Sequence, residues 1–315
     1  MLALCVESSH ARGMGHLYRA LNLLAFARSR GGDGVILVND DAAALSILVR
    51  RAVPHRAVNL GDLDSGWELG VIKEFGVGIW VNDRLTTDEK HARRVKDAGL
   101  ALATFDDSGG GAARADLHFA PLNFDERAPI GRKILRGTRY LVLDPAIAAL
   151  RRARIGDARW IVTLGGSDTY GATVKVVSLL RRAGKTATIV TGPSFRHRRE
   201  LDAVLAPGFT VLDSPPSLVT ELAAHDIAVT GGGVTAFEAA ALGLPTIVVA
   251  NEVWEGPAAH HLQNAGASRF AGPHDALRPD AFDAALDVPA MSHAALAAVG
   301  TDGAENVYNE LLAHG

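Results

Sequence analysis

The apolar run Leu2-Ala3-Leu4-Cys5-Val6, the turn Gly13-Met14-Gly15-His16 and the amphipathic stretch 17–27 follow one another at the start of the chain. A buried strand, a glycine turn and a helix in this order form an anion-binding corner of an α/β sheet, because backbone N–H groups and the positive helix end favour a negative group. The same positive end disfavours an imidazolium, so we expect His16 to be neutral and able to accept a proton. Taken alone, the segment fits an enzyme that works beside a phosphate and a glycine turn with a chance histidine equally well.

Short β-branched runs alternate with amphipathic stretches along the rest of the chain. This alternation is typical of parallel sheets covered by helices on both faces. We expect strands at 2–6, 34–38, 78–81, 100–105, 140–143, 160–164, 186–191, 210–212, 227–230 and 246–250. The pattern predicts two doubly wound, Rossmann-like α/β domains, residues 1–148 and 149–315, joined by a helix and linker at 144–157. A final helix is expected over 302–314.

Composition narrows the class of protein. The 315 residues are 48% hydrophobic and 21% charged, which indicates a globular chain. The formal net charge of −3 offers no basic surface, so nucleic acid is an unexpected partner. Cys5 is the single cysteine and is expected to be a reduced core thiol. No signal peptide or transmembrane segment is visible, and we expect a cytoplasmic protein.

Several familiar motifs fail on spacing or context. Gly184-Lys185-Thr186 resembles the end of a P-loop, but it precedes a strand and lacks the earlier glycine. Gly13 and Gly15 could open a dinucleotide fingerprint, yet Tyr18 stands at the third glycine position, so NAD binding is a minor alternative. The chain has no His-Glu-x-x-His and no cysteine cluster. We therefore expect neither a metal nor a cofactor.

A glycine-rich segment in the second half is the strongest motif. A predicted strand ends at Thr230 and runs into Gly231-Gly232-Gly233, where a ligand can approach the backbone closely. Thr235 is expected to cap the next helix, and Glu238 stands three residues later, in capping-box spacing. The alternative places a diphosphate on the glycines and ribose hydroxyls on the Glu238 carboxylate. A cap does not need three glycines, which favours the ligand.

Three motifs in order resemble the MurG-type glycosyltransferase B (GT-B) superfamily. They are Gly-x-Gly-His-x-x-Arg (13–19), Leu-Gly-Gly-Ser-Asp (164–168) and the glycine-rich Thr-x-x-Glu segment (230–238). The likeness spans nearly the whole chain and is greatest to the nucleotide-sugar hydrolase of pseudaminic acid biosynthesis and the spore-coat polysaccharide proteins, the PseG/SpsG group. It implies a GT-B fold with two domains facing a cleft, UDP on the second domain and a final helix that returns to the first.

The resemblance also implies roles for individual residues. His16 matches the family's catalytic base or acid, and Asp106-Asp107 match an Asp-Asp pair at the cleft, although strand-end turn residues look the same. We predict catalytic roles for His16 and Asp107. Substrate-binding roles are predicted for Gly13, Gly15, Arg19, Asp83, Asp106, Gly165, Gly166, Ser167, Gly232, Gly233, Val234, Thr235, Glu238 and Glu255.

Two departures fall on the sugar side of the expected site. Leu85 replaces a family tyrosine, and Glu255 stands where the family has glutamine, so a donor-and-acceptor group becomes an acceptor. Three functions therefore remain open: hydrolysis of a UDP-sugar with His16 as base, inverting transfer of the sugar to a glycan or lipid-linked acceptor, and non-catalytic binding of a nucleotide sugar. The glycine turn with its helix start is expected to stabilise the leaving diphosphate without a metal.

Overall fold

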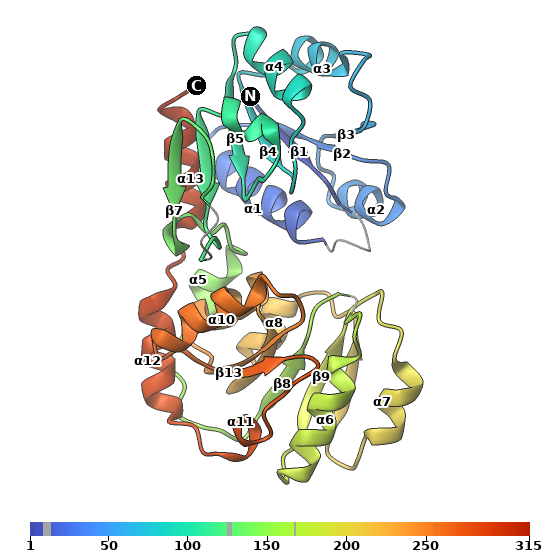
Figure 1. Ribbon diagram of the computed structural model, residues 1–315, viewed down its shortest axis with the longest axis vertical. Helices are drawn as coiled ribbons and strands as arrows, with labels where there is room; N and C mark the ends of the chain where they lie inside the picture. Colours follow the sequence, from blue (N-terminus) through green and yellow to red (C-terminus); the bar gives the residue numbers. More distant parts are fainter. Residues whose placement is uncertain (9–13, 125–127, 167) are drawn as a thin grey trace. The chain divides into compact units, whose positions relative to one another are not determined.

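The computed structural model describes residues 1–8, 14–124, 128–166 and 168–315. By its contacts the chain divides into two compact units (Figure 1). Unit 1 comprises Met1–Asp144 together with Asp302–Gly315, and unit 2 comprises Pro145–Thr301. Among the described residues, no helix combines the length and the apolar character that crossing a membrane requires.

Unit 1 is built on a seven-stranded parallel sheet in the order β3-β2-β1-β4-β5-β6-β7. Its strands are β1 Leu2–Val6, β2 Gly34–Val38, β3 His55–Ala57, β4 Ile79–Asp83, β5 Ala101–Phe105, β6 Leu117–Ala120 and β7 Lys133–Arg136. Its helices are α1 Gly15–Ser29, α2 Ala42–Arg50, α3 Trp67–Phe75, α4 Glu89–Asp97 and α13 Gly303–Leu312, with short 3₁₀ turns η1 Gly110–Arg114 and η2 Thr138–Tyr140.

Alternation along β1 explains why helices cover both faces of this sheet. Leu2, Leu4 and Val6 belong to a core formed with α1, α2 and α13, whereas Ala3 and Cys5 belong to a second core formed with α3 and α4. Successive side chains of a strand point to opposite faces. A strand that is apolar at every position must therefore be buried on both sides.

The last helix of the chain completes unit 1. In Figure 1 α13 stands beside β7, at the far end of the colour series from α1. It packs against α1 and η2. The rings of Phe26 on α1 and Tyr308 on α13 meet edge to face, with centroids 5.9 Å apart. The first unit therefore depends on a segment more than a whole domain away in sequence.

Unit 2 has a six-stranded parallel sheet in the order β10-β9-β8-β11-β12-β13. Its strands are β8 Trp160–Thr163, β9 Ala187–Thr191, β10 Thr210–Asp213, β11 Ile227–Gly231, β12 Thr246–Ala250 and β13 Ser268–Pro273. Its helices are α5 Ala146–Leu150, α6 Ala172–Arg182, α7 Arg198–Val204, α8 Leu218–Ala223, α9 Val234–Ala241, α10 Glu255–Asn264, α11 Asp280–Asp283 and α12 Val288–Ala298. The core on one face joins β8, β11 and β12 to α6 and α11.

Both sheets reverse their strand order next to the first strand of the unit. The reversal falls between β1 and β4 in unit 1, and between β8 and β11 in unit 2. In open parallel sheets, ligands bind at the carboxyl ends of the strands at this switch point. The glycine motifs of the sequence follow β1, β8 and β11, and Asp83 ends β4, whereas Asp106-Asp107 follow β5.

The predicted strand at 140–143 is wrong. Its first residue ends the 3₁₀ turn η2, and the following residues are not assigned to a strand. The sequence also missed β3, β6, β7 and β13. Two of these missed strands, β3 and β7, lie at the edges of the sheet. Strand β3 has three residues and most positions of β7 are exposed, so neither shows a long apolar run.

Candidate active site

The first switch point brings His16 and Asp83 together. His16 is the second residue of α1, directly after the β1–α1 connection, and Asp83 is the last residue of β4. Because β4 is the neighbour of β1, the His16 Nδ1 and the Asp83 carboxylate lie 2.6 Å apart. The Asp83 side chain is 4% exposed, and that of His16 is 16% exposed. The pair is thus anchored in the protein and reaches the surface through the histidine.

Arg19 fixes the position of this pair from one helical turn further along α1. Its Nε and Nη2 donate to both Asp83 oxygens, at 2.7 and 2.5 Å, and its Nη1 donates to Asp106 at 2.8 Å. The guanidinium also lies 4.6 Å from the ring centroid of Phe105, in a cation–π contact. The planar fork of arginine suits such two-pronged carboxylate binding. Residues of α1, of β4 and of the end of β5 are therefore held as one network.

The charges in this network determine which nitrogen of His16 carries the proton. Burial on its own raises the pKa of the Asp83 carboxyl, but Arg19 and His16 outweigh it and lower the pKa to about 2. An ionised Asp83 is an acceptor only, so Nδ1 of His16 carries the proton of their hydrogen bond. A neutral His16 then has its lone pair on Nε2, the arrangement in which a carboxylate orients a histidine base.

Asp106 has an unusual backbone conformation. It follows β5 directly and has a φ of +44°, which residues other than glycine rarely adopt. Strain of this kind concentrates at functional sites. Here the strained conformation places the carboxylate within reach of Arg19, beside the His16–Asp83 pair.

Asp107 makes different contacts from its neighbour. One carboxylate oxygen accepts from the backbone N–H groups of Thr87 and Gly109, at 2.9 and 2.8 Å, and the other accepts from the Thr104 hydroxyl at 2.7 Å. The side chain is buried. These bonds hold the β4–α4 and β5–η1 connections together, and the structure does not bring Asp107 into contact with His16.

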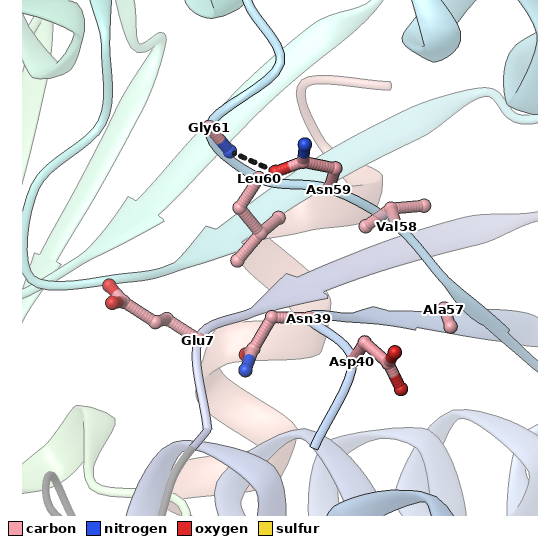
Figure 2. Close-up of a pocket in the computed structure, with 8 residues that line it drawn as sticks. All are labelled: Glu7, Asn39, Asp40, Ala57, Val58, Asn59, Leu60 and Gly61. Atoms are coloured by element: carbon pink, nitrogen blue, oxygen red, sulfur yellow. Dashed lines mark hydrogen bonds between the residues drawn. The ribbon is translucent and has the colours of Figure 1, made fainter.

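A cavity of about 630 Å³ lies at the carboxyl ends of β1, β2 and β3 (Figure 2). Its lining is Glu7, Asn39, Asp40, Ala57, Val58, Asn59, Leu60 and Gly61. Figure 2 shows Glu7 and Asn39 on one side and the loop from Val58 to Gly61 on the other. The cavity adjoins the charged network, because the backbone N–H of Glu7 donates to the carbonyl oxygen of Asp83 at 3.3 Å. It offers polar groups to a ligand that reaches the network.

The glycine turn lies at the second switch point, in unit 2. The prediction that Thr235 caps the helix after this turn is wrong. Helix α9 begins at Val234 with Gly233 as the N-cap residue, and no side chain caps it. Thr235 is therefore the second residue of the helix, and Glu238 is not in capping-box position. Glycine at the N-cap leaves the first N–H groups of α9 uncovered by a capping side chain, as an anion site requires.

Glu255 packs against this glycine turn. It is the first residue of α10, and its carboxylate accepts from the backbone N–H of Asn251 at 2.7 Å. Burial raises the pKa of Glu255, and N–H groups of Asn251 and Gly232 moderate the rise. A Cβ on Gly232 would lie 2.6 Å from the Glu255 Cβ. This glycine is thus required by the packing of α10, which the sequence did not indicate.

Two other predicted glycines have no such packing reason. A Cβ on Gly15 or Gly166 would meet nothing within 4 Å, and neither has a positive φ. Gly165, by contrast, has a φ of +99°. It follows Leu164, whose carbonyl oxygen accepts from the Asn251 amide at 3.1 Å, so the loops after β8 and β12 are tied together. Gly13 and Ser167 lie outside the described residues.

Two parallel, helix-covered sheets with their motifs at the switch points define the GT-B class, and solved structures confirm the fold prediction. The chain is similar to MurG of Acinetobacter baumannii (TM-score 0.71, 12% identity, 99% of each chain covered). It is also similar to the spinosyn rhamnosyltransferase SpnG in complex with thymidine diphosphate (TM-score 0.64, 16% identity, 98% of this chain and all of that one). A putative UDP-N-acetylglucosamine 2-epimerase of Listeria monocytogenes has a TM-score of 0.63 at 12% identity, covering 99% and 96%.

Comparisons by sequence alone do not assign the chain to a family. No protein-family profile matches the chain. It is 22% identical over 273 residues to the uncharacterized protein MJ1062 of Methanocaldococcus jannaschii, covering 79% of this chain. The chain spans 55% of the length of that relative.

Proposed function

We propose that this chain is a nucleotide-sugar-processing enzyme in which His16 activates the attacking hydroxyl group. The observation that carries the proposal is the His16–Asp83 pair, held at 2.6 Å at the switch point of the first sheet and braced by Arg19. The fold is one in which solved relatives bind thymidine diphosphate. The N-terminus of α9, which no side chain caps, and the open space at Gly166 support a diphosphate site on unit 2.

In the reaction that we favour, water attacks the anomeric carbon of a UDP-sugar, as in the PseG-type hydrolases. Nε2 of His16 takes a proton from the water, and the new C–O bond forms as the bond to the diphosphate breaks. The electron pair of that bond leaves with the diphosphate, whose negative charge the helix N-terminus stabilises. Asp83 stabilises the imidazolium that forms, and Glu238 is assigned to the ribose hydroxyls.

Sugar transfer is the second candidate, favoured by the cavity lined by Glu7 and Asn39 beside the charged network. An acceptor held there would replace water as the nucleophile. The exposed Leu85, which stands where the hydrolases have a tyrosine, also weakens the case for hydrolysis. A subunit that binds nucleotide sugars without turnover is the third alternative.

The deciding experiment incubates the protein with UDP- and dTDP-sugars, without any acceptor, and measures free nucleotide and free sugar. Release of both supports hydrolysis, whereas release that requires an added glycan or lipid-linked acceptor supports transfer. We expect His16→Ala and His16→Asn to abolish turnover and to leave nucleotide affinity nearly unchanged. His293→Ala, at an exposed histidine on α12, is the control. Wild-type turnover in the His16 variants would refute the assignment, and tight binding without turnover in the native protein would support the binding subunit.

A further inference from the structure

Among the residues that the structure describes, three arginines are at least nine-tenths buried, and Arg84 differs from the other two. Arg19 is neutralised by Asp83 and Asp106. Arg154 donates from its three guanidinium nitrogens to the carbonyl oxygens of His225, Arg152 and Ala223, at 3.0 to 3.2 Å. Within the described chain, Nε and Nη1 of Arg84 have no hydrogen-bond partner, and no ion pair involves Arg84. A buried donor without an acceptor is costly, and more so when it is charged.

The neighbouring Cys5 thiol does not neutralise Arg84. The guanidinium lies beside the Cys5 thiol, whose pKa burial raises to about 11, so the sulfur stays protonated. The third nitrogen, Nη2, donates to the carbonyl oxygen of Leu60 at 3.4 Å, near the outer limit for a hydrogen bond. A stronger acceptor can displace this contact.

Arg84 lines a second cavity of unit 1, of about 470 Å³. Leu60, Gly61 and Leu63 line it from the β3–α3 connection, and residues 86–89 and 109–110 line it from the loops after β4 and β5. Thr87, which is 2% exposed, lines it too, and its hydroxyl has no partner among the residues that the structure describes. A buried cation and a buried hydroxyl therefore border the same space.

The N-terminus of α4 also borders the cavity, but the Asp88 side chain already caps it, so it is not counted as part of the site. This nine-residue helix begins at Glu89. The two acidic side chains at this rim are engaged in other contacts. Asp88 accepts from the backbone N–H of Lys90, and Glu89 is paired with Arg114 at 2.6 Å.

We propose that this cavity is an anion-binding site in which Arg84 and Thr87 receive a phosphate or carboxylate group. The site is distinct from the His16 network. Asp83 and Arg84 are consecutive residues, but the Asp83 side chain contacts Arg19, whereas the Arg84 side chain contacts Cys5. It stands independently of the proposed function. An anionic group on a substrate, an acceptor or a regulatory ligand fits it equally.

The test follows the Arg84 Nε–H group by heteronuclear NMR while inorganic phosphate or acetate is added. A buried Nε–H exchanges slowly with water, and its signal is identified by its absence in Arg84→Met. We expect the signal to shift in a saturable manner. A response to phosphate alone indicates a phosphate ligand, and a response to acetate alone indicates a carboxylate. If neither anion moves the signal, the proposal is wrong.

Variants separate a binding role from a structural one. Thr87→Val keeps the shape of the side chain and the backbone contacts of residue 87. We expect it to lower the affinity for the anion about tenfold, the effect of losing one charge-assisted hydrogen bond. Arg93→Gln removes an exposed charge on α4 and should leave the titration unchanged. Without anion, Arg84→Met should melt no lower than the native protein, because an apolar side chain replaces unsatisfied donors. A large drop in its melting temperature would assign Arg84 a structural role and overturn the proposal.

Discussion

The Asp83 carboxylate controls the charge balance of the candidate active site. It holds His16 and Arg19 at once, and its pKa is lowered from the ordinary 3.8 to about 2. A lowered pKa stabilises the fold above the unfolded-state value, and this stability is lost as the pH falls through the folded-state value. The loss therefore falls between about pH 4 and pH 2 and amounts to about 2 kcal/mol.

We expect Asp83→Asn to remove this acid-dependent part of the stability and to lower kcat strongly, because the amide no longer fixes the histidine tautomer. Urea unfolding at neutral pH and at pH 3 measures the first effect, and turnover measures the second. Asp64→Asn, at a carboxylate that is 92% exposed, serves as a control. An unchanged pH profile in Asp83→Asn would show that the carboxylate contributes no linked proton.

A substitution of Glu238 tests the proposed nucleotide site, also at the scale of single residues. Since α9 begins at Val234 and not after Thr235, Glu238 has no capping role, and removing it should not incur the cost of about 1 kcal/mol of a lost cap. We expect Glu238→Ala to weaken nucleotide binding more than it lowers the melting temperature. Calorimetric titration with UDP and dTDP, beside a thermal melt, measures both. Unchanged affinity with reduced stability would return Glu238 to a structural role.

At the scale of elements, the two glycine turns of unit 2 differ: packing requires the glycine at position 232 but not the one at position 166. Gly232→Ala places a methyl group 2.6 Å from Glu255 Cβ, and overpacking of this kind costs about 1 to 3 kcal/mol. Gly166→Ala meets nothing within 4 Å and should change the free energy of unfolding by less than about 0.5 kcal/mol. If a diphosphate approaches this backbone, Gly166→Ala should nevertheless weaken nucleotide binding. A Gly166→Ala protein with native affinity would show that the ligand keeps away from this turn.

The same elements show what the sequence can and cannot predict. Buried strands such as β1 and β12 are continuous apolar runs and were predicted to the residue. The edge strand β7 carries three exposed residues in four, so it has no such signal. His16 and Asp83 were both singled out, but their contact depends on β4 lying next to β1, which is a property of strand order. Arg84 and Asn251 were missed because their significance depends on partners distant in sequence.

At the scale of the whole molecule, unit 1 takes its last helix from the far end of the chain. Val307 and Leu311 of α13 are at most 1% exposed, and Tyr308 is 7% exposed. All three belong to the core that α1 and β1 share. Burying an apolar side chain of this size contributes about 1.5 to 3 kcal/mol. The three side chains together therefore contribute about 4.5 to 9 kcal/mol to unit 1, a large part of the stability of an ordinary domain.

Deletion of residues 302–315 should accordingly destabilise unit 1 and leave unit 2 nearly unchanged. Urea unfolding followed by the tryptophans of each unit distinguishes the two, because Trp67 and Trp80 lie in unit 1 and Trp160 and Trp254 in unit 2. Leu312→Ala, at a residue that is 54% exposed, is the matched control and should cost less than about 0.5 kcal/mol. Turnover should disappear with unit 1, since the His16 network lies on α1, against which α13 packs. A truncated chain whose unit 1 tryptophans unfold at the native urea concentration would show that α1 and the sheet form a stable core without the returning helix.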